Sequence, residues 1–430
     1  MRVMKVGEKF SAEILDNGAN GNGIAKIDGF VCFVPYCVKG ENATFKIKNI
    51  QKNFCECELE EIISPSKDRA TPQCPYFGSC GGCQLQHMSK TLQSEYKTNQ
   101  IKSIFKKSFD NKIDISPCVS ENEYHYRNKV NFAIRDNKLC FYNCNQQLFA
   151  VESCPLFVVD LTDIISIFNK YLASVNTNFQ ALHIRLLGDE YQFTFVSTTL
   201  DFPQKEQLIS LLQQKNIKFS LNICKNSIKN SSNITNNVIC IYGNAKQDYD
   251  ILGIKNKISP ASFLQINQKV QDRIYNDINL LIPKTSKVIN AYGGTGILSS
   301  IISKQTQIVY SIELNKSASK NCEEMIKLNN LKNIKSVCGD CKVEIPSILQ
   351  KDKITHIIFD PPRSGIDKTI LNCVKNLKIS NIIYLSCNPA TLVRDLKLLE
   401  DIYEISSVQP YDMFPQTAHI ETLVQLKLKI

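Results

Sequence analysis

The feature that most constrains the fold is a repeated pattern in the last part of the chain. From about residue 255 onward, a short apolar strand, a turn, a helix and another strand follow one another several times. Strands that alternate with helices form a parallel sheet, because each crossover helix packs back on a face of that sheet. Residues 255–430 are therefore predicted to form a parallel α/β domain.

The first sixty residues follow a different pattern. Short runs that alternate apolar and polar residues are separated by glycine-rich turns, which predicts a small β-barrel over residues 1–60. The segment GNGIAKIDGFVCFVPYCVKGE, residues 21–41, resembles a TRAM domain, an RNA-binding module of the oligonucleotide/oligosaccharide-fold type. Four lysines supply positive charge, Lys39, Lys46, Lys48 and Lys52. No aromatic stacking platform is obvious, so a purely structural barrel is the alternative.

Residues 61–254 separate these two parts. A loop rich in Pro, Cys and Gly covers residues 64–83, and a helical stretch follows at about residues 87–108. Strand-like and helix-like segments then mix up to about residue 250. We expect a central α+β domain here, with the helix at 87–108 packed on the C-terminal domain. A chain of 430 residues is long enough for three such units.

The composition bears on the cellular location of the protein and on its binding partners. The first residues, MRVMKVGEKFSAEI, carry charges where a secretory signal would be apolar, and no apolar run reaches about eighteen residues. We therefore expect a cytoplasmic monomer with no membrane partner. The net charge of +10 would attract a nucleic acid, although a mildly basic surface without such a partner fits equally well.

The eighteen cysteines are spread over a long chain, which favours metal binding or catalysis over disulfides. Cys74, Cys80 and Cys83 stand in CPYFGSCGGC, and Cys154 follows in ESCPLF. Four thiolates can hold a [4Fe–4S] cluster or a structural zinc ion, and the residues alone leave both open. The pair in CGDC, Cys338 and Cys341, has no second pair to complete a site, so we interpret it as core or loop thiols.

Several carboxylates follow the expected strands of the C-terminal domain. KVINAYGGTGILSSII reads as a strand, a glycine-rich turn and a helix, and Glu313 ends the next strand, where a carboxylate can accept hydrogen bonds from a ribose diol. Asp340 and Asp360 end two further strands. These strand ends should converge on one crevice, which predicts a bound nucleoside. An unrelated doubly wound domain with incidental carboxylates is the alternative.

Two more residues suggest catalysis at the same edge. Cys387 ends the strand in NIIYLSCNPATLVRDL and precedes a helix, whose N-terminus would favour the thiolate of a nucleophile. Glu421 lies in the final apolar strand, where a carboxylate is expensive to bury unless it carries a proton or has a partner. A buried filler cysteine and a solvent-facing edge glutamate are the alternatives.

Taken in order, these motifs resemble the RNA uracil-5-methyltransferase family. The matching phrases are SFLQIN, AYGGTG, IEL, FDPPRSG, SCNPATLVRDL and HIETL, and the resemblance covers nearly the whole chain. It implies a Rossmann-like, class I methyltransferase domain that uses S-adenosylmethionine. It further implies that Cys387 is the nucleophile and Glu421 the base. The residues implied to contact S-adenosylmethionine are Gln265, Tyr292, Glu313, Asp340 and Asp360.

The cysteine spacing is similar to that of family members that act on 23S ribosomal RNA. This resemblance implies a [4Fe–4S] cluster held by Cys74, Cys80, Cys83 and Cys154. Arg127 and Lys129, in YHYRNKVNFAIR, are expected to contact RNA, with a solvated strand face as the alternative. The TRAM-like barrel and the cluster cysteines together favour ribosomal RNA, because family members that act on transfer RNA generally lack both.

Other hypotheses about the function fit parts of the same sequence. Transfer RNA could be the substrate, or the chain could be a non-catalytic ribosome-assembly factor. A radical methylthiotransferase also carries a TRAM domain, but its cysteine spacing of three and two residues is missing here.

One departure from the family concerns the cofactor. The strand before the glycine-rich turn usually ends in an acidic residue and has Cys after the aromatic residue, whereas this chain has Asn290 and Gly293, which predicts a weaker site.

Overall fold

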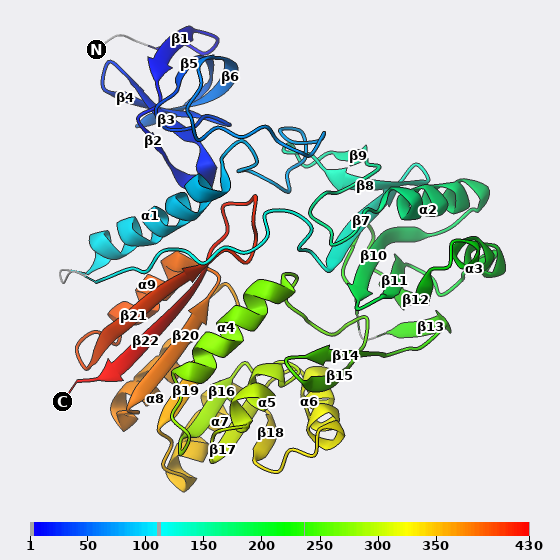
Figure 1. Ribbon diagram of the computed structural model, residues 1–430, viewed down its shortest axis with the longest axis vertical. Coiled ribbons are helices and arrows are strands. Elements are labelled where there is room, and N and C mark those ends of the chain that lie inside the picture. Colours follow the sequence, from blue (N-terminus) through cyan, green and yellow to red (C-terminus); the bar gives the residue numbers. More distant parts are fainter. Residues whose placement is uncertain (1–3, 110–112, 236, 430) are drawn as a thin grey trace.

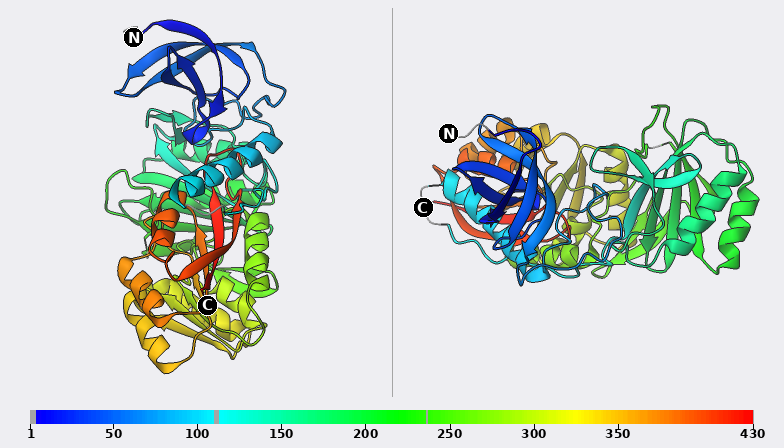
Figure 2. Two further views of the ribbon diagram at one scale, coloured as in Figure 1. Left: turned by 90° about the vertical axis from the view of Figure 1, so that its left-hand side faces the viewer. Right: turned by 90° about the horizontal axis from the view of Figure 1, so that it is seen from above.

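Three sheets organise the computed structural model, which describes residues 4–109, 113–235 and 237–429. Figure 1 shows the N-terminal sheet at the top, a central sheet at the right and a C-terminal sheet at the bottom, and Figure 2 gives two perpendicular views of the same arrangement. Within the described residues, no helix is both long and apolar enough to cross a bilayer.

The N-terminal sheet curls onto itself. β1 and β2 are nearly continuous, and they pair with β5 at one end and with β3 at the other. Alternate residues point inward, so Ala25, Phe45 and Ile47 are buried in the barrel core. Its elements are β1 (Lys9–Glu13), β2 (Asp16–Asn17), the 3-10 turn Ala19–Gly21, β3 (Gly23–Ile27), β4 (Phe30–Val34), β5 (Asn42–Ile50) and β6 (Phe54–Ser64).

The central sheet has the order β13-β12-β11-β10-β7-β8-β9. Only β11 and β12 are parallel, because α3 connects them as a crossover. α2 and α3 cover one face and bury its apolar side chains, including Phe168 and Phe195. The elements are β7 (Lys129–Arg135), β8 (Lys138–Tyr142), β9 (Leu148–Ala150), α2 (Thr162–Ser174), β10 (Phe179–Leu187), β11 (Glu190–Ser197), α3 (Lys205–Gln214), β12 (Lys218–Lys225) and β13 (Val238–Tyr242).

The C-terminal sheet has the order β18-β17-β16-β19-β20-β22-β21. A hairpin, β14 (Gln247–Ile251) and β15 (Ile254–Ile258), precedes it. The elements that build the sheet and its helical layers are α4 (Gln268–Leu280), β16 (Lys287–Ala291), α5 (Ile297–Ser303), β17 (Ile308–Glu313), α6 (Lys316–Leu328), β18 (Ile334–Cys338), α7 (Cys341–Lys351), β19 (His356–Phe359), α8 (Lys368–Leu377), β20 (Asn381–Ser386), α9 (Pro389–Lys397), β21 (Tyr403–Tyr411) and β22 (Glu421–Leu428).

In this sheet, the strands β18, β17, β16, β19 and β20 run parallel to one another, as the sequence pattern predicts. The exception among the described strands is β22, which runs antiparallel to both of its neighbours, β20 and β21. The physical reason is the connection from β21 to β22: residues 412–420 form no crossover helix, so the chain returns as a hairpin. Helices cover both faces, and the neighbours Ile357 and Ile358 on β19 point into the two opposite layers.

One long helix joins the C-terminal domain from outside its own sequence. α1 (Lys90–Ser108) begins three residues later than the expected helix, because Ser89 caps it by accepting a hydrogen bond from the Leu92 amide. Its residues Ile101 and Phe105 are buried in the same core as α9 and β21. Figure 1 shows α1 lying between the barrel and the C-terminal sheet.

This packing gives a stability prediction. Ile101→Ala should lower the free energy of unfolding of the C-terminal domain by about 2–5 kcal/mol, because the side chain is fully buried and its removal leaves a cavity. Urea unfolding followed by intrinsic fluorescence would measure it. The exposed neighbour Lys102→Ala is the control, with an expected change within about 0.5 kcal/mol. Equal midpoints for the two variants would contradict the packing role of α1.

Candidate active site

A cavity of about 740 Å³ lies at the carboxyl ends of the parallel strands. This volume is in the range of pockets that hold drug-sized ligands. Every residue that the sequence suggested for cofactor contact or catalysis lines it: Gln265, Tyr292, Glu313, Asp340, Asp360, Cys387 and Glu421. The cavity is therefore the place where these separate motifs meet.

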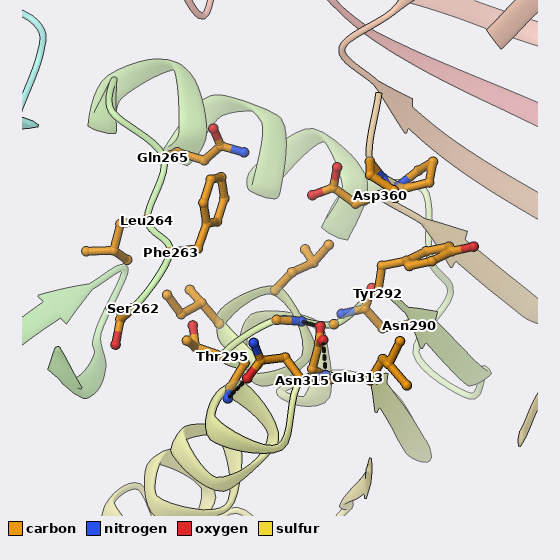
Figure 3. Close-up of a pocket in the computed structure, with 18 of the residues that line it drawn as sticks. Ser262, Phe263, Leu264, Gln265, Asn290, Tyr292, Thr295, Glu313, Asn315 and Asp360 are labelled. Carbon is orange, nitrogen blue, oxygen red and sulfur yellow. Dashed lines mark hydrogen bonds between the residues drawn. The ribbon is translucent and has the colours of Figure 1, made fainter. Parts of the chain in front are cut away.

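The glycine-rich turn forms one wall of the cavity (Figure 3). Gly294 has a left-handed backbone, with φ of 57°, and nothing lies within 4 Å of where its Cβ would be. A ligand can therefore approach this backbone closely. Gly293 is required for another reason, since a Cβ there would come within 2.3 Å of the Ser311 hydroxyl. Tyr292 also adopts a left-handed backbone, with φ of 59°, which is strained for an aromatic residue.

Glu313 is held rigidly at the end of β17. One carboxylate oxygen accepts a hydrogen bond from the Gly294 amide at 2.9 Å, and the other accepts one from the Asn315 amide at 2.7 Å. An ionised carboxylate has about four lone-pair sites, so two remain for a ligand diol. The geometry therefore fits a nucleoside ribose. Asn290 behaves differently, because it is buried and donates to Ser299 Oγ at 2.8 Å.

Gln265 and Asp360 lie across the cavity from Glu313 (Figure 3). The backbone carbonyl of Gln265 accepts a hydrogen bond from Asn128 at 3.0 Å, which ties this wall to the central sheet. Burial raises the pKa of Asp360 to about 7. Asp340, in contrast to the buried Asp360, is exposed. Its side chain caps α7 by accepting a hydrogen bond from the Lys342 amide at 2.9 Å.

Cys387 follows β20 and is half-buried at the cavity wall. Asn388 caps the next helix, α9, with its side chain accepting from the Ala390 amide. Burial raises the pKa of the Cys387 thiol, and the nearby Glu421 raises it further. The net direction is thus opposite to the thiolate-favouring effect expected of the helix N-terminus. Arg363 is the nearby charge that stabilises the thiolate.

Glu421 is the first residue of β22 and is only 5% exposed. Burial raises its pKa from 4.5 to about 8, and the neighbouring Asp360 adds to the effect while Arg363 opposes it. A carboxylate in this environment takes up a proton readily near neutral pH. The buried position rules out the alternative of a solvent-facing edge residue.

The cysteine motif forms a second cavity of about 420 Å³. Cys74, Cys80, Cys83 and Cys154 all line it. Within the described residues, no three His, Cys, Asp or Glu side chains lie close enough to hold one metal ion. The structure nevertheless brings the four predicted cysteines to one cavity, and a set of four thiols is one that a [4Fe–4S] cluster or a zinc ion can take.

Arg127 and Lys129 line this second cavity as well. Arg127 Nε donates to the Tyr126 hydroxyl at 3.2 Å. Burial lowers the pKa of Lys129 to about 8, and the positive charge of Arg185 lowers it further. Arg127 therefore lies near the thiols of Cys80, Cys83 and Cys154, and Lys129 lines the same cavity. Positive charge at this place would stabilise deprotonated thiols.

Sequence reasoning gave no role to three residues that the structure brings to the active-site cavity. Arg363 and His419 line it together with Cys387 and Glu421, and Phe263 lines it with 72% of its surface exposed. Each lies in a motif already singled out, in FDPPRSG, HIETL and SFLQIN respectively. The sequence signal that could have identified these three residues is their position close to Asp360, Glu421 and Gln265 in the chain.

The raised pKa of Glu421 predicts a pH-dependent stability. Because the folded state favours the protonated form, this stabilisation is present at low pH and is lost as pH rises through about 8. Glu421→Gln should therefore lessen the loss of unfolding free energy between about pH 5 and about pH 9. Thermal unfolding without ligand would measure it, with the exposed Glu404→Gln as control. Parallel pH curves for wild type and Glu421→Gln would refute the burial argument.

Comparisons with known proteins agree with this architecture. Three family models match parts of the chain: TRAM domain at residues 4–59, Ribosomal RNA adenine dimethylase at 255–359 and tRNA (Uracil-5-)-methyltransferase at 343–429. The first confirms the resemblance of the N-terminal barrel. A solved structure of the Pyrococcus abyssi tRNA (uracil-54, C5)-methyltransferase, in complex with S-adenosyl-L-homocysteine, has the same fold. Its TM-score is 0.77 at 20% identity, over 97% of this chain and 99% of that one.

Relatives in bacteria match over almost their full length. A protein of Caldanaerobacter subterraneus named as an RNA methyltransferase is 32% identical over 98% of this chain and 99% of its own. One of Protochlamydia amoebophila with the same name is 32% identical over 99% of each chain. One of Clostridium acetobutylicum is 31% identical over 99% of this chain and 98% of its own. The chain therefore belongs to the RNA uracil-5-methyltransferase family, whose members are S-adenosylmethionine-dependent RNA methyltransferases.

Proposed function

We propose that this enzyme methylates carbon 5 of a uridine in 23S ribosomal RNA, with Cys387 as the nucleophile and Glu421 as the proton acceptor. One observation carries the mechanism: Cys387 and Glu421 line the same cavity, at whose other wall Glu313 presents a carboxylate suited to a ribose. A thiol and a carboxyl group whose pKa is raised to about 8 thus flank the space into which a methyl donor would reach.

The chemistry explains why both groups are needed. Carbon 5 of uracil is a weak nucleophile, so the Cys387 thiolate first adds to carbon 6 and the ring electrons move to carbon 5. S-adenosylmethionine supplies the methyl group as an electrophile on sulfur. Once carbon 5 carries the methyl group, Glu421 removes its proton. The electrons of that C–H bond restore the ring double bond and expel the Cys387 sulfur, which regenerates the enzyme.

The raised proton affinity of Glu421 suits this last step, because a base with a pKa of about 8 binds a proton strongly while still being partly ionised near neutral pH. Arg363 would help the first step by favouring the Cys387 thiolate. The target uridine must reach the thiol through its carbon 6, so it leaves its stack or lies in an RNA loop. The exposed ring of Phe263 at the cavity supplies an apolar surface for a neighbouring base.

In this proposal S-adenosylmethionine is held by Gln265, Tyr292, Glu313, Asp340 and Asp360. Glu313 would accept hydrogen bonds from the ribose, and its two backbone partners keep it oriented for them. Asn290 supplies no charge, so the methionine ammonium group depends on another acceptor, such as Asp360. This is the basis for expecting a weaker cofactor site than in relatives with an acidic residue there.

We assign a [4Fe–4S] cluster to Cys74, Cys80, Cys83 and Cys154 in a central domain, residues 61–254, between the barrel, 1–60, and the methyltransferase domain, 255–430. The cavity that the four thiols share supports this assignment. Arg127 and Lys129 in its wall would offset the negative charge of the thiolates. If RNA reaches this wall, the same two residues are the contacts we propose for its phosphates.

Transfer RNA is the second candidate substrate. The barrel does not exclude it, because a solved transfer-RNA methyltransferase aligns with 97% of this chain. The expectation that such enzymes generally lack the barrel therefore does not separate the two substrates. The cysteine set is the remaining feature that favours ribosomal RNA.

The first test uses RNA in which 5-fluorouridine replaces uridine. Because fluorine cannot leave as a proton, wild-type enzyme should form an adduct with 23S ribosomal RNA that survives denaturation and is visible as a shifted band on a denaturing gel. Cys387→Ala is the matched control and should give no adduct. Transfer RNA is run in parallel: trapping there and not with 23S RNA would overturn the ribosomal target, and no adduct with either would overturn the mechanism.

A second test concerns the cysteines. Protein purified without oxygen should be brown, absorb broadly in the visible range and contain about four iron atoms per chain. Cys83→Ser should lose this absorption, whereas Cys338→Ser, which changes an exposed cysteine outside the cavity, should keep it. Stoichiometric zinc without iron would overturn the cluster assignment.

A further inference from the structure

The segment that delivers Glu421 to the cavity has no regular structure of its own. Residues 412–420 connect β21 to β22, and Phe414 and His419 within them line the active-site cavity just before Glu421. An irregular segment has no ladder of backbone hydrogen bonds to fix it. Its position must therefore be set by contacts with other parts of the molecule.

Gln416 is the most constrained residue of this segment. Its backbone is left-handed, with φ of 70°, although it is not glycine. Such a conformation is strained for a residue with a side chain and persists only where the surroundings enforce it. Gln416 is also only 1% exposed, so solvent does not satisfy its polar groups.

Each polar group of Gln416 has a partner from a distant part of the chain. Gln93 of α1 bonds to both its side chain and its backbone: Gln93 Nε2 donates to Gln416 Oε1 at 3.0 Å, and the backbone N–H of Gln416 donates to Gln93 Oε1 at 3.1 Å. The Gln416 carbonyl accepts from the amides of Gln84 at 2.9 Å and Leu85 at 3.0 Å. Its Nε2 donates to the Glu123 carbonyl at 3.4 Å.

A buried ion pair holds the start of the same segment. Lys97 of α1 donates to Asp412 at 2.5 Å and to the Phe414 carbonyl at 3.2 Å. The two side chains are 0% and 2% exposed. A buried pair of this kind fixes a specific geometry, because either charge without the other would be very costly. Figure 1 shows the red loop between β21 and β22 reaching the N-terminal part of α1.

We propose that Gln416 is a positioning residue: its clamp to Gln93 and to the Gln84–Leu85 backbone fixes the loop that leads into β22. The loop thereby supports the first pair of that strand, Tyr411 with Glu421, and sets the Glu421 side chain beside Cys387 for proton removal. The inference rests on the proposed function. It also explains why α1, which lies within residues 61–254 in sequence, packs on the C-terminal domain. Gln84 and Leu85 directly follow Cys83, so the same clamp joins the segment to the cysteine cavity.

The proposal predicts that loss of the clamp affects one chemical step more than another. Cys387 follows β20, and none of the hydrogen bonds of Gln416 reaches β20 or α9. Addition of the thiolate to carbon 6 therefore continues when the clamp is broken, while proton removal by a displaced Glu421 slows. Methylated RNA should then accumulate on Cys387.

The test uses Gln416→Gly, because glycine keeps the left-handed backbone and its hydrogen bonds but removes the side-chain bonds to Gln93 Nε2 and to the Glu123 carbonyl. With ordinary uridine RNA and S-adenosylmethionine, turnover should fall on the order of 100-fold, the loss expected for a catalytic group displaced by about 1 Å. A denaturation-resistant protein–RNA adduct should appear that the wild type resolves. Gln93→Ala breaks the clamp from the helix side and should do the same, which keeps the test valid if Gln416→Gly fails to fold.

Gln204→Gly is the matched control, since Gln204 is also left-handed, with φ of 48°, but is exposed at the start of α3. It should neither slow turnover nor accumulate adduct. Glu421→Gln is the reference and should accumulate adduct. If Glu421→Gln accumulates the adduct and neither Gln416→Gly nor Gln93→Ala does, the inference is wrong while the proposed function stands. If Glu421→Gln gives no adduct, the role of Glu421 falls and the inference with it. Equal losses of adduct formation and turnover in the clamp variants would indicate a purely structural role and also overturn it.

Discussion

The structure depends on one topological constraint: parallel strands place all their carboxyl ends at the same edge of the sheet. β16, β17, β19 and β20 run in one direction, so the residues that follow them meet in one cavity although they are far apart in the sequence. The antiparallel β22 enters that edge from the opposite direction. As a result its first residue, Glu421, and not its last, lies beside Cys387 and Asp360.

Burial gives this cavity its chemical character. Asp360 and Glu421 both lose hydration there, and the pKa of each is raised, to about 7 and about 8. Two acidic groups that share a dry site with a cysteine thiol cannot all be ionised, which makes proton transfer between enzyme and substrate feasible near neutral pH. Arg363 is the cation that limits this effect. The same burial costs stability at high pH, so the site is tuned for reaction and not for the strength of the fold.

The segment before β22 is held from three places within residues 61–254. α1 contributes Lys97 and Gln93, the residues after Cys83 contribute two backbone amides, and Tyr126 donates to the Pro415 carbonyl at 2.9 Å. The cysteine cavity and the active-site cavity are therefore mechanically connected, because Arg127 beside the thiols also donates to the Tyr126 hydroxyl. This gives a physical reason for the position of the cysteines, in the part of the chain that supports the segment before β22.

The sequence by itself determined the class of fold, the barrel, the glycine turn, the carboxylates at the strand ends and the cysteine set, because each depends on local periodicity or spacing. It also indicated that Glu421 would be costly to bury. It did not predict that β21 and β22 form an antiparallel hairpin, that Arg127 and Lys129 line the cysteine cavity, or that burial raises the pKa of the Cys387 thiol. Nor could it pair Gln93 with Gln416 or Lys97 with Asp412, which lie more than 300 residues apart. Those features arise only when distant segments pack together and exclude water, so only the tertiary structure decided them.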